Sequence, residues 1–130
     1  MISEKPRTVT ASLECLAERM GDPKDAIYSR LFALYPDLEQ LFFLDTNGDV
    51  RGEMLSQAFD VLMKAEAGNS QADILVRAAR FAHDGYGVSE VQFDIFFDVL
   101  REVTQEALQE DWTRDTESAW LNVLAQLKAN

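Results

Sequence analysis

The sequence predicts one all-α domain. Apolar residues recur at spacings of three and four along almost the whole chain, and no useful stretch alternates apolar and polar residues as a half-buried strand would. The chain has 130 residues, of which 47 % are hydrophobic. That length favours a single domain over residues 1–130, and that composition excludes an intrinsically disordered chain. We therefore expect about seven short-to-medium helices with short connections.

Residues 9–20 predict the first helix, because their apolar side chains fall on one face and Gly21 then ends the run. A second helix is expected to begin with Asp22 as its N-cap and Pro23 in its first turn, where the missing N–H costs nothing. Pro36 disfavours the helical conformation in the residue before it. The second helix should therefore end there, and a short new turn should follow.

The second half of the chain predicts four more helices. Residues 45–49 contain Asp, Asn and Gly and read as a loop. Ser89, with Gln92 three residues later, matches a capping box, in which each residue satisfies the other's backbone N–H. The four predicted helices cover residues 49–67, residues 70–84, a stretch that follows Ser89 and a last stretch from about Thr113.

The charge and the cysteine content narrow the classes of partner. The chain has 12 Lys and Arg residues against 23 Asp and Glu residues, a net charge of −11, which disfavours nucleic-acid binding. No apolar run approaches the roughly 18 residues of a membrane-spanning helix, so no membrane partner is expected. Cys15 is the one cysteine, and residues 1–7 lead into no signal-peptide core, so a reducing, cytoplasmic location is expected.

His83 is the one histidine in the chain, and this limits the metal chemistry. Zinc enzymes and two-histidine iron sites need further His or Cys ligands, so the sequence excludes them. Haem iron needs only one imidazole, because the porphyrin supplies four other ligands. The alternative is an imidazole that interacts only with the dipole at the end of its helix.

Three segments of the chain resemble bacterial globins. Residues 80–88, Arg-Phe-Ala-His-Asp-Gly-Tyr-Gly-Val, resemble the segment in which a globin helix ends just past the haem-ligating histidine. Residues 27–42 resemble the Y-x-R-[LM]-F … P-E-L-x-x-[IL]-F stretch of flavohaemoglobins and single-domain bacterial haemoglobins. Residues 111–120 resemble the entry into the last helix of that family, so the resemblance covers residues 9–128.

The resemblance implies a globin fold, a three-over-three helical sandwich, with haem b between the helices of residues 49–67 and 70–84. It implies that His83 binds the iron through one ring nitrogen. The other ring N–H would bind a backbone carbonyl one turn earlier, that of Ala79. Phe42 would stack against the haem; its alternative role is that of a core phenylalanine at a helix corner.

On the distal side, the resemblance implies that Tyr28 points its hydroxyl at the bound gas and that Leu55 is the apolar residue above the iron. Arg51 falls where the family often has a gating Gln or His, but a one-residue slip would put Val50 there instead. Arg51 would contact the ligand, hold a haem propionate or be solvated. Tyr86 is a further candidate haem contact, because tyrosine ligates ferric iron in some haem proteins.

The function implied is reversible binding of dioxygen or another diatomic gas. Phe93 stands where flavohaemoglobins have a tyrosine, and the sequence stops at Asn130, before the last-helix glutamate of that family. These two groups support peroxidase-like chemistry and efficient nitric-oxide dioxygenation, so the resemblance favours gas binding over catalysis. Catalysis would need an external reductase, since no G-x-G-x-x-G motif is present. The alternative is a haem-free or weakly haem-binding globin-like module that regulates a partner protein.

Overall fold

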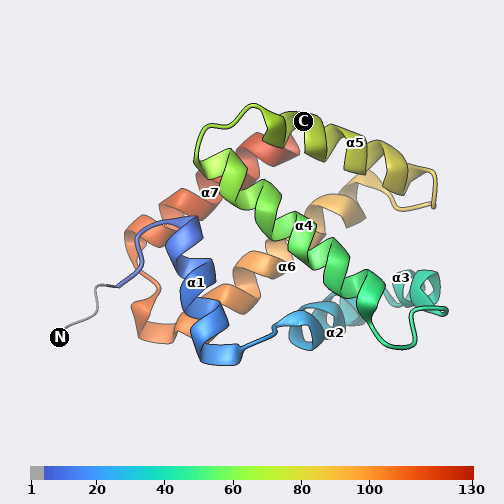
Figure 1. Ribbon diagram of the computed structural model, residues 1–130, viewed down its shortest axis with the longest axis horizontal. Helices are drawn as coiled ribbons and strands as arrows, with labels where there is room; N and C mark the ends of the chain where they lie inside the picture. Colours follow the sequence, from blue (N-terminus) through green and yellow to red (C-terminus); the bar gives the residue numbers. More distant parts are fainter. Residues whose placement is uncertain (1–4) are drawn as a thin grey trace.

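The computed structural model describes residues 5–130 and contains seven α-helices in that range (Figure 1). They are α1 (Val9–Met20), α2 (Lys24–Leu34), α3 (Pro36–Glu39), α4 (Asp49–Glu66), α5 (Gln71–Asp84), α6 (Glu90–Leu108) and α7 (Arg114–Lys128). Short 3-10 helices, η1 (Gln40–Phe42) and η2 (Gln109–Asp111), follow α3 and α6. Residues 5–130 contain no strand, which confirms the all-α prediction. No helix in this range is long and apolar enough to cross a membrane.

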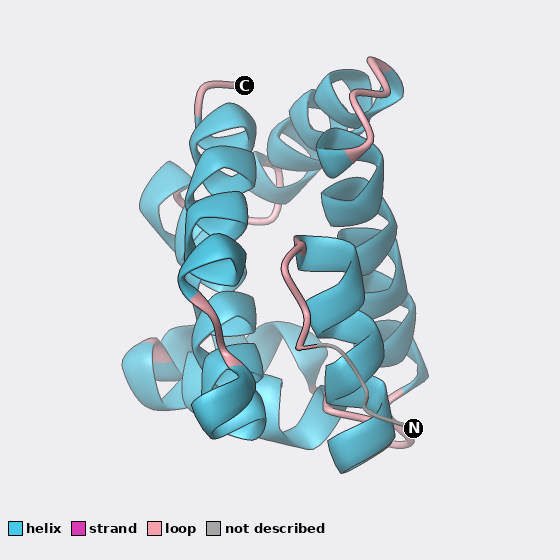
Figure 2. Ribbon diagram, turned by 90° about the vertical axis from the view of Figure 1, so that its left-hand side faces the viewer, coloured by secondary structure: helices cyan, strands magenta, loops and turns pink. Residues whose placement is uncertain are grey.

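The helices form two layers, seen edge-on in Figure 2. In Figure 1, α1 and α4 lie in front of α6 and cross it. Helix α6 packs against α1 and α2, while α4 packs against α1, α5 and α7. Helices that are far apart in the sequence therefore meet around one core, in which Leu16, Leu62 and Leu100 are fully buried.

Trp120 lies at the centre of this core and ties α7 to α1. Its ring is fully buried, and its Nε1–H donates to the hydroxyl of Ser12 at 2.9 Å. The Ser12 hydroxyl in turn donates to the backbone carbonyl of Val9 at 2.6 Å. A buried indole N–H needs a hydrogen-bond acceptor, and the Ser12 hydroxyl supplies it for Trp120. This accounts for a polar side chain in the core.

Helix α2 begins one residue later than the sequence predicted. Pro23, rather than Asp22, is the residue that precedes the first helical turn, and its carbonyl accepts from the Ile27 N–H at 3.0 Å. The Asp22 carboxylate still accepts from the Lys24 N–H at 3.0 Å, so it performs the work of a capping side chain from one position further out. The capping box of Ser89 and Gln92 and the helix start at Thr113 are confirmed.

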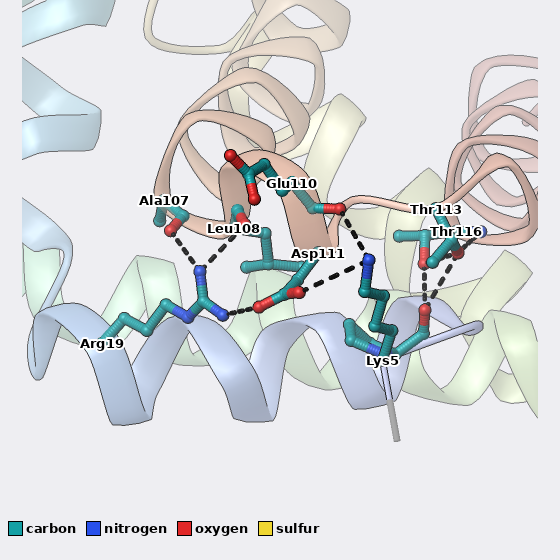
Figure 3. A network of polar contacts seen from close by, with 9 residues as sticks. Lys5, Arg19, Ala107, Leu108, Glu110, Asp111, Thr113 and Thr116 are labelled. Atoms are coloured by element: carbon teal, nitrogen blue, oxygen red, sulfur yellow. Dashed lines mark hydrogen bonds and ion pairs between the residues drawn. The ribbon is translucent and has the colours of Figure 1, made fainter. Parts of the chain in front are cut away.

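Arg19 of α1 holds the turn between α6 and α7 (Figure 3). Its guanidinium donates to the carbonyls of Ala107 at 3.1 Å and Leu108 at 2.9 Å, and it forms an ion pair with Asp111. The last carbonyls of a helix have no partner within that helix, and a cation is favoured beside them. Arg19 therefore fixes where α6 ends and, through η2, where α7 begins.

Candidate functional site

A cavity of about 400 Å³ lies among α2, α3, η1, α4, α5 and α6. Its lining is mainly apolar, with a few polar groups, which is typical of a small-molecule or cofactor site. The polar side chains in the lining are those of Tyr28, Gln57, Asp60, His83 and Gln92. Of the predicted site residues, the structure brings Tyr28, Phe42 and His83 together in this lining.

His83 lies in the last turn of α5, and its ring has a defined tautomer. Its Nδ1 lies 2.7 Å from the backbone carbonyl oxygen of Ala79, one turn earlier, as the sequence predicted. A carbonyl oxygen only accepts, so Nδ1 must carry the proton. In the neutral ring the other nitrogen, Nε2, has a free lone pair, and His83 lines the cavity. This is the state in which an imidazole binds a metal ion.

Phe93 of α6, which also lines the cavity, contacts both His83 and Arg80 of α5. The rings of His83 and Phe93 meet edge to face, with centroids 5.3 Å apart. The guanidinium carbon of Arg80 lies 4.7 Å from the centroid of the Phe93 ring. Phe93 has no hydroxyl, so it offers the imidazole an apolar contact where a tyrosine would offer a hydrogen bond.

Tyr28 is almost fully buried, and its hydroxyl is already hydrogen bonded. The phenol donates to the backbone carbonyl of Arg51, at the start of α4, over 3.0 Å. Burial raises the pKa of the Tyr28 phenol well above its ordinary value of 10.0, so the group stays protonated and remains a donor. The ring also packs against Phe32, Phe42 and Phe96, with centroid separations of 5.7 to 5.8 Å.

Arg51 does not line the cavity but forms an ion pair with Asp45, whose role was not predicted from the sequence. The Arg51 Nε–H donates to the Asp45 carboxylate at 3.0 Å, and Nη2 donates to the Asp45 carbonyl at 3.1 Å. The same carboxylate accepts the backbone N–H groups of Val50 and Arg51, both at 3.0 Å. The sequence signal for this capping role was an Asp that lies shortly before the start of a helix, ahead of an Asn-Gly loop. The network fixes the first turn of α4 and the carbonyl to which Tyr28 donates.

The charge of Asp45 should make the free energy of unfolding depend on pH in the acid range. Its burial alone would raise the pKa, but hydrogen bonds from Val50 and Arg51 and the Arg51 charge lower the pKa of Asp45 below its ordinary value of 3.8. A carboxylate with a lowered pKa stabilises the folded state fully above its ordinary pKa, and this stabilisation is lost as pH falls through the folded value.

We therefore expect the Asp45→Asn variant to unfold in less urea than the wild type at pH 7, and the difference between the two proteins to shrink towards pH 3. Urea unfolding at both pH values measures this, and the wild-type protein is the reference at each. An unchanged difference at pH 3 would show that the Asp45 charge does not stabilise the start of α4.

Leu55 is buried in the core and is not among the residues that line the cavity. Successive residues on a helix are about 100° apart, so neighbouring positions face different sides. Met54, Ala58 and Val61 share the face of α4 that lines the cavity. Met54, one residue before Leu55, therefore occupies the lining position. Val50 itself does not line the cavity.

Tyr86 follows α5 and is 76 % exposed, and it does not line the cavity. The sequence did not predict Met54 and Gln57, which both line the cavity. The available signal was the apolar periodicity of residues 49–66, but this periodicity also fits the face that carries Leu55. Sequence spacing alone does not separate two adjacent helix positions that both fall near the apolar face.

Comparison with known proteins gives one match. The sequence profile of the globin family matches residues 25–130. No curated protein and no solved structure matches the chain. The profile covers most of the chain, and a mainly apolar cavity with His83 in its lining lies among the helices of residues 5–130. The chain belongs to the globin family.

Proposed function

We propose that this chain binds haem b in the cavity, with His83 as the iron ligand, and reversibly binds dioxygen or another diatomic gas at the iron. The observation that carries the proposal is the hydrogen bond between His83 Nδ1 and the Ala79 carbonyl, which in the neutral ring leaves Nε2 as a free ligand atom in a residue that lines the cavity. We propose a cytoplasmic location with it, because the single Cys15 suits a reducing compartment.

The residues present fit haem in their chemistry. One neutral imidazole is a usual axial ligand for haem iron, and the remaining lining is mainly apolar, as the porphyrin ring requires. When bound, the haem would supply an iron centre that takes a diatomic gas as a further ligand. Phe42 would pack against the ring from η1, and Met54, Ala58 and Val61 would exclude water from the distal side.

A haem-free regulatory module is the second candidate, and one observation favours it. No Lys or Arg is among the described residues that line the cavity, whereas Asp60 is. Haem carries two carboxylates, and a carboxylate near them without a cation is unfavourable. Asp60 forms an ion pair with Lys64 at 2.7 Å, but Lys64, one turn further along α4, is not part of the lining.

Haem uptake separates these two candidates. Protein purified after expression with ample haem, or titrated with haem, should be red and show a strong Soret band. The ferrous spectrum should change on addition of carbon monoxide. A protein that stays colourless throughout the titration would exclude gas binding at haem and favour the regulatory module.

Nitric-oxide dioxygenation or peroxidase-like activity would require an external reductase as partner. The apolar contact from Phe93 gives His83 no side-chain hydrogen bond that would make the imidazole more electron-donating. We therefore propose gas binding, rather than catalysis, as the main activity.

Met54 and Leu55 provide a test of which residue lies above the iron. We expect Leu55→Ala to lower the free energy of unfolding by about 2–5 kcal/mol, because it leaves a hole in the core. It should leave carbon monoxide rebinding nearly unchanged. Met54→Ala should instead speed rebinding, because it widens the cavity, and should cost less stability, since Met54 is only partly buried. Urea unfolding and flash photolysis measure the two effects; the reverse pattern would place Leu55 above the iron.

A further inference from the structure

Helix α5 carries His83, yet it buries few apolar side chains. Ala72 and Val76 are its buried residues, while Ile74 is 62 % exposed and Phe81 is 83 % exposed. Helices in proteins are stabilised mainly by the packing of an apolar face, so α5 is weakly held by this means. Other contacts must fix the position of its last turn.

Polar contacts join α5 to the end of α7. Asp73 accepts hydrogen bonds from the side chains of Gln126 and Asn130, both at 3.1 Å. Arg77 donates to the Asn130 side chain at 2.8 and 3.1 Å. The Arg77 contact is exposed, and exposed contacts of this kind contribute little to stability.

Arg80 makes contacts of a different kind. Its side chain is only 15 % exposed, and its Nη2 donates to the Asp94 carboxylate of α6 at 2.8 Å and to the Leu127 carbonyl of α7 at 3.3 Å. The guanidinium also lies over the ring of Phe93, which packs edge to face against His83. Arg80 thus joins three helices one turn before the histidine.

The Arg80 Nε atom is buried and has no hydrogen-bond partner among residues 5–130. Such an atom carries a desolvation cost that an apolar residue would not have. Phe93 contacts both the guanidinium and the imidazole, so the positive charge lies close to the histidine. Asp94 balances that charge.

We propose that Arg80 is a positioning residue for His83. It holds the last turn of α5 against α6 and α7, and it places a positive charge against the Phe93 ring, which also contacts the imidazole. The contacts by which Arg80 holds the last turn of α5, which we call the clamp, exist in the chain without haem. The effect of the Arg80 charge on iron rests on the proposed function.

Amide hydrogen exchange in the haem-free protein tests the clamp. We expect Arg80→Gln to speed exchange of the amides in residues 80–84 by at least about tenfold, because the last turn then opens more often. Amides in α1 of the same sample should exchange as in the wild type, which shows that the fold is intact. Arg80→Lys should restore part of the protection through Asp94, and Arg77→Gln serves as the matched control. Equal exchange in the Arg80→Gln and Arg77→Gln variants would overturn the clamp.

The reduction potential of the haem-loaded protein tests the charge. The Arg80→Gln variant loses the cation and leaves Asp94 unpaired, so it should favour ferric iron. The Asp94→Asn variant leaves the Arg80 cation unpaired, so it should favour ferrous iron. We expect shifts of roughly tenfold in the ferric-to-ferrous equilibrium, about 59 mV for one electron, in opposite directions. A merely structural role would shift both variants in the same direction, and that result would overturn the electrostatic part. If the wild type takes up no haem, the proposed function fails, while the exchange experiment still decides the clamp.

Discussion

Replacing His83 with alanine should abolish haem retention or weaken it severely. No other histidine in the chain can take its place. Tyr86, a residue type that ligates ferric iron in some haem proteins, is 76 % exposed and outside the cavity lining. Its hydroxyl would have to enter the cavity by a rearrangement of the turn after α5. The far-UV circular dichroism should stay unchanged, because the side chain lies in the last turn of α5 and outside the buried core.

The Soret band of the purified variant, in both oxidation states, is the measurement. Tyr86→Phe is the matched control and should bind haem as the wild type does. Free imidazole added to His83→Ala should restore part of the spectrum, since it can fill the vacated volume and supply the missing nitrogen. An unchanged spectrum in the alanine variant would show that His83 is not the iron ligand.

Replacing Tyr28 with phenylalanine should speed dioxygen release while changing carbon monoxide release much less. Bound dioxygen carries partial negative charge, so a hydrogen bond from the phenol to it would be partly charge-assisted and worth about 1.5–3 kcal/mol. In the structure the same proton is held by the Arg51 carbonyl at 3.0 Å, and a neutral bond of that kind is worth about 0.5–1.5 kcal/mol. The net gain is the difference between these two bonds. We therefore expect dioxygen release to accelerate by about tenfold, since about 1.4 kcal/mol corresponds to a factor of ten.

Stopped-flow measurement of both release rates, in the wild type and in Tyr28→Phe, tests this expectation. Tyr35→Phe is the control for the loss of a phenolic hydroxyl, because Tyr35 ends α2 and does not line the cavity. Equal, small changes for both gases would mean that Tyr28 only packs in its aromatic cluster and keeps its bond to Arg51.

Features set by neighbours in the chain were predictable from the sequence. Ser89 and Gln92 form a capping box because they lie three residues apart at a helix start. The hydrogen bond from His83 to the Ala79 carbonyl was implied by the resemblance to bacterial globins, and it too is local, because it spans one helical turn. Helix ends were less predictable: Asp22 and Pro23 were misplaced by one position, because local rules fix a helix start no more closely than that.

The sequence by itself therefore determined the all-α class, the helix order and the histidine that faces the cavity. Only the tertiary structure decided which side chains meet across helices. The Tyr28 hydroxyl binds a carbonyl 23 residues away, and Arg80 reaches Leu127, 47 residues away. The rotation of α4 about its own axis decides that Met54, and not Leu55, lines the cavity. Local spacing determines which residues share a helix face, but the packing of neighbouring helices determines what that face meets.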